Sequence, residues 1–416
     1  MSIYLEAAAS IGRELAATAG PAQGRWVGDC LVGKKSGGHQ VIRQDVGPDL
    51  YGGSAGIGMV LAHLAGPAGA VELAITARTA LRSALIEGKQ LARNSDQLAL
   101  YSGASGIALA CDAGARALGD DELRADAEVL ACQVSGSAGM AGNDDVDLIA
   151  GRAGILIALL ALGATRPSKP FLRLVGALAE QIIQRSTSGW WGRAQSDPSG
   201  ISLCGLGHGA SGIAWALLAA GKHLGSEDFE LAGEEFLKFE EGQFDLSHGS
   251  WPDLRPRQSD PTAPPAWMDA WCHGALGIGA LRWHLWQNAR RPRDLAWATA
   301  SLWSARRLVV QVAAFDGVSD MTLCHGLAGS AELMLLAFEA TGLEEHLRAA
   351  RRVGDFILQL RNRNGGRWTA GLPGGEDVPG LMLGRAGLAA LFLRLHDPSA
   401  MESPMLPGSR ALGSPA

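Results

Sequence analysis

The chain alternates between two kinds of helical segment. In the first kind, Ala and Leu recur with charged residues between them at the spacing of an amphipathic helix. In the second kind almost every position is apolar or Gly, and a helix that is apolar on all sides is a buried helix. The amphipathic segments are residues 1–18, about 70–92, 121–134, 170–186, 227–241, 293–313 and 345–361, and the apolar ones include 54–66, 152–163 and 327–340.

A Gly-x-x-Gly motif opens the apolar segments and repeats along the whole chain. Its copies are GSAG at 53–56, GASG at 103–106, GRAG at 151–154, GASG at 209–212, GALG at 274–277, GLAG at 326–329 and GRAG at 384–387. Successive copies begin 48 to 65 residues apart, and a long regular period is typical of repeat proteins. We therefore predict an all-α fold, an α/α toroid (barrel) of seven helix pairs and about fourteen helices, with each charged outer helix followed by a buried inner one.

The same pattern sets the expected domain organisation. A closed ring of repeats can exceed the usual domain size, so we expect one domain over residues 1–400 and a flexible C-terminal tail over residues 401–416. No segment alternates like a long strand, and strands are expected only as short pieces in loops. Two long connections, 250–266 and 363–380, are rich in Pro and Gly, and long loops in compact folds are often functional.

Charge and composition exclude several classes of protein. The 36 Lys and Arg residues against 42 Asp and Glu give a net charge of −6 without a basic block, which argues against nucleic-acid binding. The N-terminus has no basic region followed by an apolar core, and no apolar run is long enough to span a membrane. The 6 cysteines in a long chain without a secretory signal indicate a reducing, cytoplasmic location rather than a disulfide scaffold.

Three copies of the glycine motif are preceded by metal-binding or titratable residues. Cys272 and His273 precede one copy, Cys324 and His325 the next, and His208 an earlier one. Equivalent positions of neighbouring repeats converge when repeats close into a ring. Thiolate and imidazole are zinc ligands, and a catalytic zinc keeps three protein ligands and one open position. The pattern predicts a zinc site with two cysteines and one histidine, and either His273 or His325 can complete it.

Two further residues are candidates for proton transfer. His208 would be a general acid or base, because imidazole titrates near neutral pH. Asp147 lies four residues before Gly151. It would either stabilise the start of the following helix or orient a histidine of the site. Five tryptophans surround the ligand-bearing loops and would belong either to the core or to a peptide-binding rim; they are Trp190, Trp191, Trp251, Trp267 and Trp271.

The motifs as a set resemble the LanC-like lanthionine synthetase (lanthipeptide cyclase) family. The resemblance runs from LYGGSAGIG at 50–58 to PGLMLGRAGLAALFLRLHDP at 379–398. WCHG at 271–274 looks like the cyclase domain of bifunctional class II (LanM-type) enzymes. The resemblance implies an α/α toroid with Zn²⁺ held by Cys272, Cys324 and His325, and it makes His208 and Asp147 catalytic candidates. His273, which this ligand set leaves over, is a further catalytic candidate as an acid or base. Many stand-alone cyclases of this family carry an arginine at the position of Met268, so here either the charge comes from another residue or the chemistry is tuned differently.

The reaction implied by the resemblance is formation of (methyl)lanthionine rings. A peptide Cys thiolate adds to dehydroalanine or dehydrobutyrine in a dehydrated precursor peptide that has a leader and a core. A separate kinase/lyase or dehydratase partner would supply the dehydrated residues. One alternative is a LanC-like protein that adds glutathione or another thiol to dehydroamino acids. Another is a non-catalytic, zinc-containing scaffold that binds peptides.

Overall fold

The structure is a computed structural model that describes most of the chain. The described residues are 2–20, 24–33, 39–139, 145–163, 168–186, 202–255, 264–314, 320–372 and 375–413. The helices that precede the glycine motifs are α1 (Ile3–Thr18), α3 (Val71–Leu91), α5 (Asp121–Ala138), α7 (Lys169–Ser186), α9 (Glu227–Gly242), α11 (Pro292–Ala314) and α13 (Glu344–Arg363). The helices that the motifs open are α2 (Ser54–Ala68), α4 (Ala104–Leu118), α6 (Arg152–Gly163), α8 (Ala210–Leu224), α10 (Ala275–Ala289), α12 (Leu327–Thr341) and α14 (Arg385–His396).

A few short elements complete the described part of the chain. They are β1 (Val27–Gly33), β2 (His39–Asp45), the short 3₁₀ helix η1 (Ser95–Gln97), β3 (Pro252–Asp253), β4 (Ala266–Trp267) and α15 (Ser409–Gly413). Strands β1 and β2 form one antiparallel pair, and β3 and β4 form another. The predicted alternation of amphipathic and apolar helices is therefore confirmed, and the strands lie in the connections between helices.

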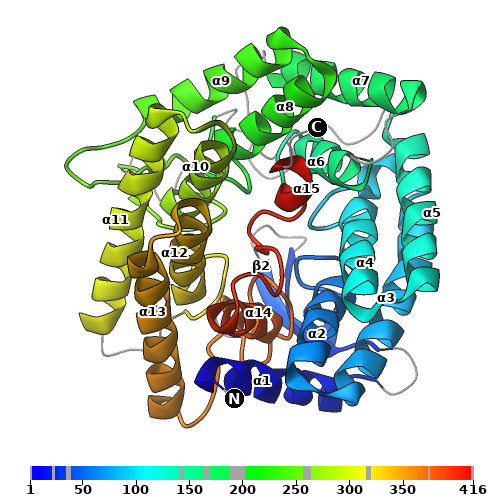
Figure 1. Ribbon diagram of the computed structural model, residues 1–416, viewed down its shortest axis with the longest axis vertical. Coiled ribbons are helices and arrows are strands. Elements are labelled where there is room, and N and C mark those ends of the chain that lie inside the picture. Colours follow the sequence, from blue (N-terminus) through cyan, green and yellow to red (C-terminus); the bar gives the residue numbers. More distant parts are fainter. Residues whose placement is uncertain are drawn as a thin grey trace. The chain divides into compact units, whose positions relative to one another are not determined.

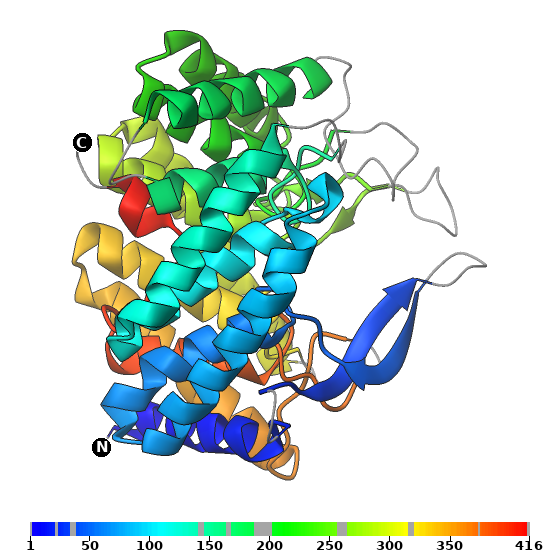
Figure 2. The same ribbon diagram turned by 90° about the vertical axis from the view of Figure 1, so that its right-hand side faces the viewer.

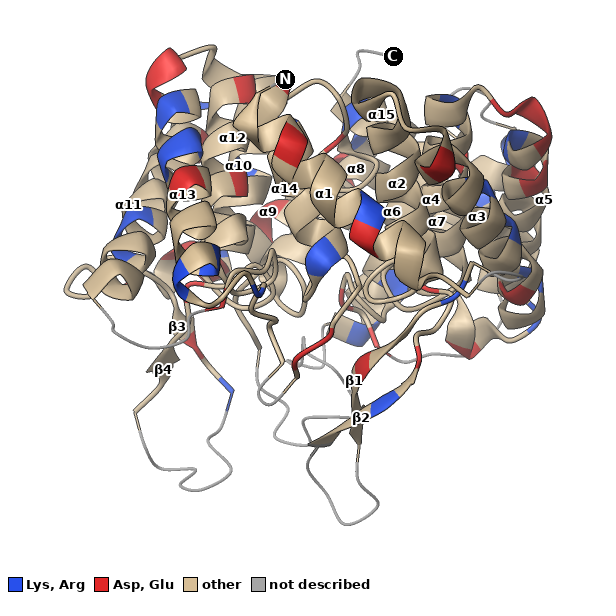
Figure 3. Cartoon of the chain, turned by 90° about the horizontal axis from the view of Figure 1, so that it is seen from below, with Lys and Arg blue, Asp and Glu red and all other residues tan. Residues whose placement is uncertain are grey.

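Burial follows the two hydrophobic patterns. Helix α12 is buried on all sides, whereas α13 buries one stripe that includes Leu347, Ala350, Val353 and Ile357. That stripe has the three- and four-residue spacing of one helix face. Helix α2 contains no charged residue, while Figure 3 shows blue and red positions along α11 and α13. On α13 the charged residues Glu344, Glu345, Arg348 and Arg352 are exposed, so the charged face of this helix meets solvent.

The glycine motif replaces a side-chain cap at the start of its helices. The cap residue is glycine in α2, α8, α10, α12 and α14, and none of these has a side-chain cap. The first helical N–H groups instead reach carbonyl oxygens seven residues earlier: Arg152 donates to Asp145 (3.0 Å) and Arg385 donates to Val378 (2.9 Å). The loop before each motif therefore folds back over the helix start and satisfies donors that the helix itself leaves free.

The second glycine of the motif makes room for that loop. A Cβ on Gly154 would lie 2.1 Å from the carbonyl oxygen of Leu148, and one on Gly277 would lie 2.0 Å from that of Trp271. Both acceptors stand six residues before the glycine. Any side chain at this position would displace the loop, so the motif sets the loop geometry that carries the candidate site.

The chain divides into two compact units. Unit 1 comprises Met1–Lys89, Ala110–Val129 and Val309–Pro404, and unit 2 comprises Gln90–Leu109, Leu130–Leu308 and Met405–Ala416. In unit 1, α1 packs beside α14 and α2 (Figure 1). The β1–β2 hairpin projects from these helices next to the segment that leads to α14 (Figure 2), where the Asp29 N–H donates to the Asp377 carbonyl oxygen (2.8 Å).

In unit 2, α8 packs against α9 and α6, and α10 contacts α8. Part of the segment expected to be a flexible tail is packed here. Met405 and Leu406 are buried, α15 contacts α6 and α10, and the indole N–H of Trp271 donates to the Met405 carbonyl oxygen (3.0 Å). Burial of the apolar side chains of Met405 and Leu406 stabilises this packing. No described helix combines the length and apolar character that crossing a membrane requires.

Candidate active and metal site

One half of the predicted site lies on the loop that leads into α8, in unit 2. This loop runs against the loop that leads into α10. The Leu206 N–H donates to the Trp271 carbonyl oxygen (3.3 Å), and the His208 N–H donates to the Cys272 carbonyl oxygen (3.4 Å). At Gly205, φ is +112° and a Cβ would lie 2.5 Å from the Cys272 oxygen. Glycine at this position therefore allows the two loops to approach closely.

Asp147 holds the ring of His208. Its side chain is fully buried, and its Oδ2 lies 2.6 Å from His208 Nδ1. Its Oδ1 accepts a hydrogen bond from the Ala150 N–H (2.7 Å), as Asp49 does from the Gly52 N–H in the first repeat (2.8 Å). One oxygen thus stabilises the turn before α6 and the other orients the histidine, so the two interpretations of Asp147 are compatible. A carboxylate at Nδ1 leaves Nε2 of His208 for proton transfer.

His273 packs on the ring of His208. The two rings are stacked, with centroids 5.0 Å apart and planes 24° apart. His273 is buried, with 6% of its surface exposed, and Cys272 is buried with 8% exposed. Unit 2 therefore places one candidate zinc ligand and two imidazoles within a single pair of loops.

Glu240 on α9 fixes the segment that carries His208. Its fully buried carboxylate accepts the Gly205 N–H (2.8 Å) and the Ser211 hydroxyl (2.5 Å), three residues to either side of His208. Burial raises the pKa of Glu240 to about 7, although the hydrogen bonds from Ser211 and Gly205 and the charge of Arg282 act in the opposite direction. Glu240 thus connects both ends of the segment around His208 to helix α9.

The other half of the predicted site lies on the loop that leads into α12, in unit 1. The buried Cys324 Sγ accepts a hydrogen bond from the Tyr51 hydroxyl (3.3 Å), and the Cys324 N–H donates to the Met382 carbonyl oxygen (3.0 Å). His325 Nδ1 lies 2.6 Å from Asp320 Oδ2. Burial acts to raise the pKa of Asp320, but the hydrogen bond and charge of His325 hold it below its ordinary value.

The donor atoms of this second loop fit zinc. Because Nδ1 of His325 faces Asp320, Nε2 is the nitrogen that would bind a metal. Metal-bound histidines usually donate their other N–H to a carboxylate or a carbonyl in this way. A hydroxyl that donates to the sulfur of Cys324 favours its thiolate form, which is the form that binds a metal.

The complete zinc ligand set stays a prediction. Cys272 belongs to unit 2, whereas Cys324 and His325 belong to unit 1. Among the described residues, no group of three or more His, Cys, Asp or Glu side chains is placed so that it could hold a metal ion.

Arginines from elsewhere in unit 2 lie near the position of Met268. The Nη2 atom of Arg255 is 3.8 Å from Met268 Sδ, and its guanidinium also pairs with Asp253 (2.6 Å). Arg307 pairs with Asp269, the residue after Met268 (2.8 Å). Positive charge is therefore present here without an arginine at position 268.

The rim interpretation of the tryptophans is wrong for two of them. Trp251 and Trp271 are buried core residues. Trp267 is 37% exposed and stacks on His248, with ring centroids 3.8 Å apart. Trp190 and Trp191 lie outside the described residues.

Three residues that hold the site are not among the candidates picked out from the sequence alone. Asp320 stands seven residues before Leu327, at the loop position whose carbonyl oxygen accepts the first helical N–H, and that register could have singled it out. Glu240 shares the buried face of α9 with Phe236 and Leu237, a spacing that marks an acidic residue on an apolar face. Tyr51 carries no comparable signal.

Comparisons with known proteins agree with the predicted fold. The chain is similar to the solved structure of nisin cyclase, with a TM-score of 0.63 and 18% sequence identity over 89% of this chain and 94% of that one. This similarity confirms the predicted fold class, an all-α fold of the α/α toroid type. A family model described as "Lanthionine synthetase C-like protein" matches residues 44–407. That match covers most of this chain, and the chain therefore belongs to the lanthionine synthetase C-like family.

Proposed function

We propose that the protein is a zinc-dependent lanthipeptide cyclase. It would add Cys thiolates of a peptide to dehydroalanine or dehydrobutyrine residues of the same peptide and so form lanthionine or methyllanthionine rings. Membership of the family supports an activity of this class. The observation that carries the proposal is the buried carboxylate of Asp147 on the ring of His208, because an imidazole oriented by a carboxylate is positioned to transfer a proton.

Cys272, Cys324 and His325 are the residues that would hold the zinc ion. When bound, zinc lowers the pKa of a substrate thiol at its open position and keeps it as a nucleophilic thiolate. The contacts of Tyr51 with Cys324 and of Asp320 with His325 would hold these two ligands in orientation before the metal arrives.

His208 would manage the proton of the reaction. A lone pair of the sulfur forms the new C–S bond at the β-carbon, and the electrons of the C=C bond move towards the α-carbon and its carbonyl. The α-carbon then takes a proton, which we assign to Nε2 of His208 because Asp147 occupies Nδ1. The proton lost by the substrate thiol balances the one delivered, and no electrons enter or leave overall, so the addition needs no redox partner.

The other assignments follow from the same arrangement. His273, stacked on His208, would hold that ring in place and shield it from water. The WCHG sequence at 271–274 favours a relationship to the cyclase domains of class II enzymes. The substrate would be a precursor peptide with leader and core, dehydrated in the cytoplasm by a kinase/lyase or a dehydratase.

The test combines zinc content with ring formation. Elemental analysis should find about one zinc per chain in the wild type. It should find none in Cys324→Ala and an unchanged amount in Cys132→Ala, which alters an exposed cysteine. Ring closure of a dehydrated peptide, followed as loss of alkylatable thiol, should fail in His208→Ala. A wild type without zinc, or a His208→Ala variant with full activity, would refute the proposal.

A further inference from the structure

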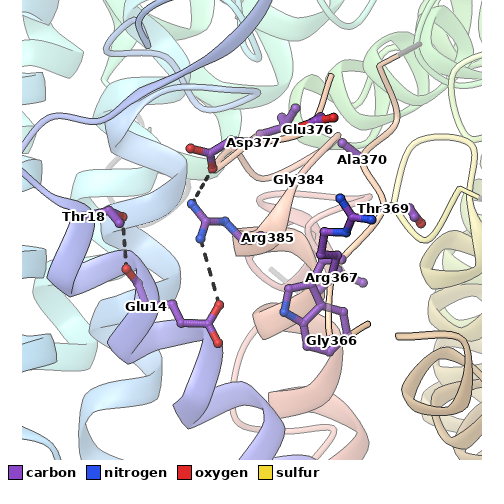
Figure 4. A pocket seen from close by; sticks show the side chains of 13 residues that line it. Glu14, Thr18, Gly366, Arg367, Thr369, Ala370, Glu376, Asp377, Gly384 and Arg385 are labelled. Atoms are coloured by element: carbon purple, nitrogen blue, oxygen red, sulfur yellow. Dashed lines mark hydrogen bonds and ion pairs between the residues drawn. The ribbon is translucent and has the colours of Figure 1, made fainter. Parts of the chain in front are cut away.

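A pocket in unit 1 lies beside the predicted zinc ligand His325 and has no assigned role. Its volume is about 280 Å³, and it is lined by the end of α1, the first turn of α14 and parts of the long connection between α13 and α14. Figure 4 shows Arg385 reaching towards Glu14 on one side and Asp377 on the other, with Arg367 on a different segment of the wall.

The acidic groups at the centre of this pocket are already paired. Arg385 lies 2.7 Å from an oxygen of Asp377 and 4.0 Å from one of Glu14. Asp377 also accepts from Arg43 of the hairpin (2.9 Å). The carboxylate of Glu376 is exposed, so water can solvate it. These carboxylates therefore do not need a cationic ligand to balance their charge.

Hydrogen-bond donors of the same pocket lack acceptors. The indole Nε1 of Trp368 and the Nε of Arg385 are buried, and neither has a partner among the residues that the structure describes. The guanidinium of Arg367 is exposed and has no acceptor among the residues that the structure describes. An unpaired buried donor is unfavourable, so a turn of the Trp368 or Arg385 side chain towards a ligand oxygen in the pocket would be favoured.

The pocket wall continues directly to His325. Residues Gly366–Ala370 line the pocket, and a Cβ on the next residue, Gly371, would lie 2.8 Å from Cε1 of His325. Gly371 is anchored there, because its N–H donates to the Leu383 carbonyl oxygen (3.2 Å). Four residue steps separate Arg367 from Gly371, a span of at most about 14 Å.

We propose that this pocket binds the part of a substrate peptide next to its reacting cysteine and selects peptides with an acidic side chain within about four residues of that cysteine. This inference rests on the proposed function, since it places the cysteine at the zinc site. Arg367 pairs with the carboxylate of the peptide, and main-chain carbonyl oxygens accept from Trp368 and Arg385. Figure 4 shows Arg367 and Arg385 on two different segments of the pocket wall.

The experiment measures binding of synthetic peptides to the purified full-length protein. Fluorescein-labelled peptides carry one cysteine and one Glu, Gln or Lys within that reach, in a Gly/Ser background, and contain no dehydrated residue. Fluorescence anisotropy should show the Glu peptide binding about fivefold more tightly than the Lys peptide, as expected for one charge-assisted hydrogen bond. Arg367→Glu should reverse this order.

Two further variants test whether the change in peptide binding comes from the pocket or from a general change in surface charge. Arg363→Glu changes the same charge at an exposed position near the end of α13 that does not line the pocket, and it should leave the order of the peptides unchanged. Trp368→Phe keeps a ring against Phe392 but removes the indole donor, so all peptides should bind more weakly by a similar factor.

Each outcome bears on the pocket separately from the cyclase proposal. Equal affinities for the Glu and Lys peptides, or the same change in Arg363→Glu as in Arg367→Glu, would overturn the inference. Charge-ordered binding by a protein that closes no rings would support the pocket and refute the cyclase. Ring closure by a protein that binds the Glu and Lys peptides equally would support the cyclase and overturn the inference about the pocket.

Discussion

Replacing Glu240 with glutamine isolates the cost of a buried carboxylate beneath the His208 loop. Burial raises the pKa of Glu240 to about 7 in the folded protein, against 4.5 for an unperturbed glutamate. The folded state therefore binds this proton more tightly than the unfolded chain. Its contribution to stability is fully present below pH 4.5 and is lost as the pH rises through about 7. The difference is worth roughly 3 kcal/mol in all, of which about 2.5 kcal/mol falls between pH 5 and pH 8.

Glutamine keeps the shape of the site and removes the titration. Its amide oxygen can still accept the Gly205 N–H, and the Ser211 hydroxyl can turn to accept from the amide NH₂. We therefore expect the free energy of unfolding of Glu240→Gln, relative to the wild type, to rise by about 2.5 kcal/mol from pH 5 to pH 8.

Urea unfolding followed by circular dichroism at the two pH values gives this difference directly. Other titrating groups cancel, because both proteins share them. Glu235→Gln is the matched control for the loss of one carboxylate on α9, since Glu235 is exposed and forms an ion pair with the exposed Lys238 (2.6 Å). A Glu240→Gln difference that stays constant between pH 5 and pH 8 would show that the reasoning about burial is wrong.

Three other substitutions test the orientation of the two histidines. Asp147→Asn keeps an oxygen for Ala150 but opposes the required tautomer of His208, so ring closure should slow by about 10²–10⁴-fold while zinc content is unchanged. Asp320→Asn should weaken zinc binding about 10- to 100-fold, measured by chelator competition. Gly371→Ala would place a Cβ against the ring of His325 and should weaken zinc binding by a similar factor; unchanged affinity in either variant would contradict the proposed ligand.

The helices could be predicted from the sequence because their signals are local. The buried face of α13 repeats at helical spacing, and α12 is apolar at nearly every position, so pattern alone distinguishes the two kinds of helix. The register of the glycine motif likewise indicates where side chains with related roles stand. Burial of Met405 and Leu406 was not predictable, because a short apolar stretch between prolines does not reveal whether a core surface is available to it.

Partners that come from distant segments could not be predicted. Tyr51 lies 273 residues from Cys324, yet its hydroxyl donates to the sulfur. Glu240 stands in an acidic segment of α9, where only the three-dimensional structure shows that it bonds to the loop of His208. Such contacts depend on how repeats pack, and a single sequence contains no direct record of that packing.

The three histidines of the site illustrate how repeats acquire different chemistry. His208, His273 and His325 all stand immediately before the first glycine of a motif, so they occupy the same register position of the repeat. Their surroundings differ. His325 is oriented by Asp320 from its own loop, His208 by Asp147 from the preceding repeat, and His273 by stacking on His208. Orientation of the proposed metal ligand is therefore a local property of one loop, whereas orientation of the proposed acid requires two repeats to be packed together. Loosening the packing between repeats should for this reason disturb proton transfer before it disturbs the orientation of His325.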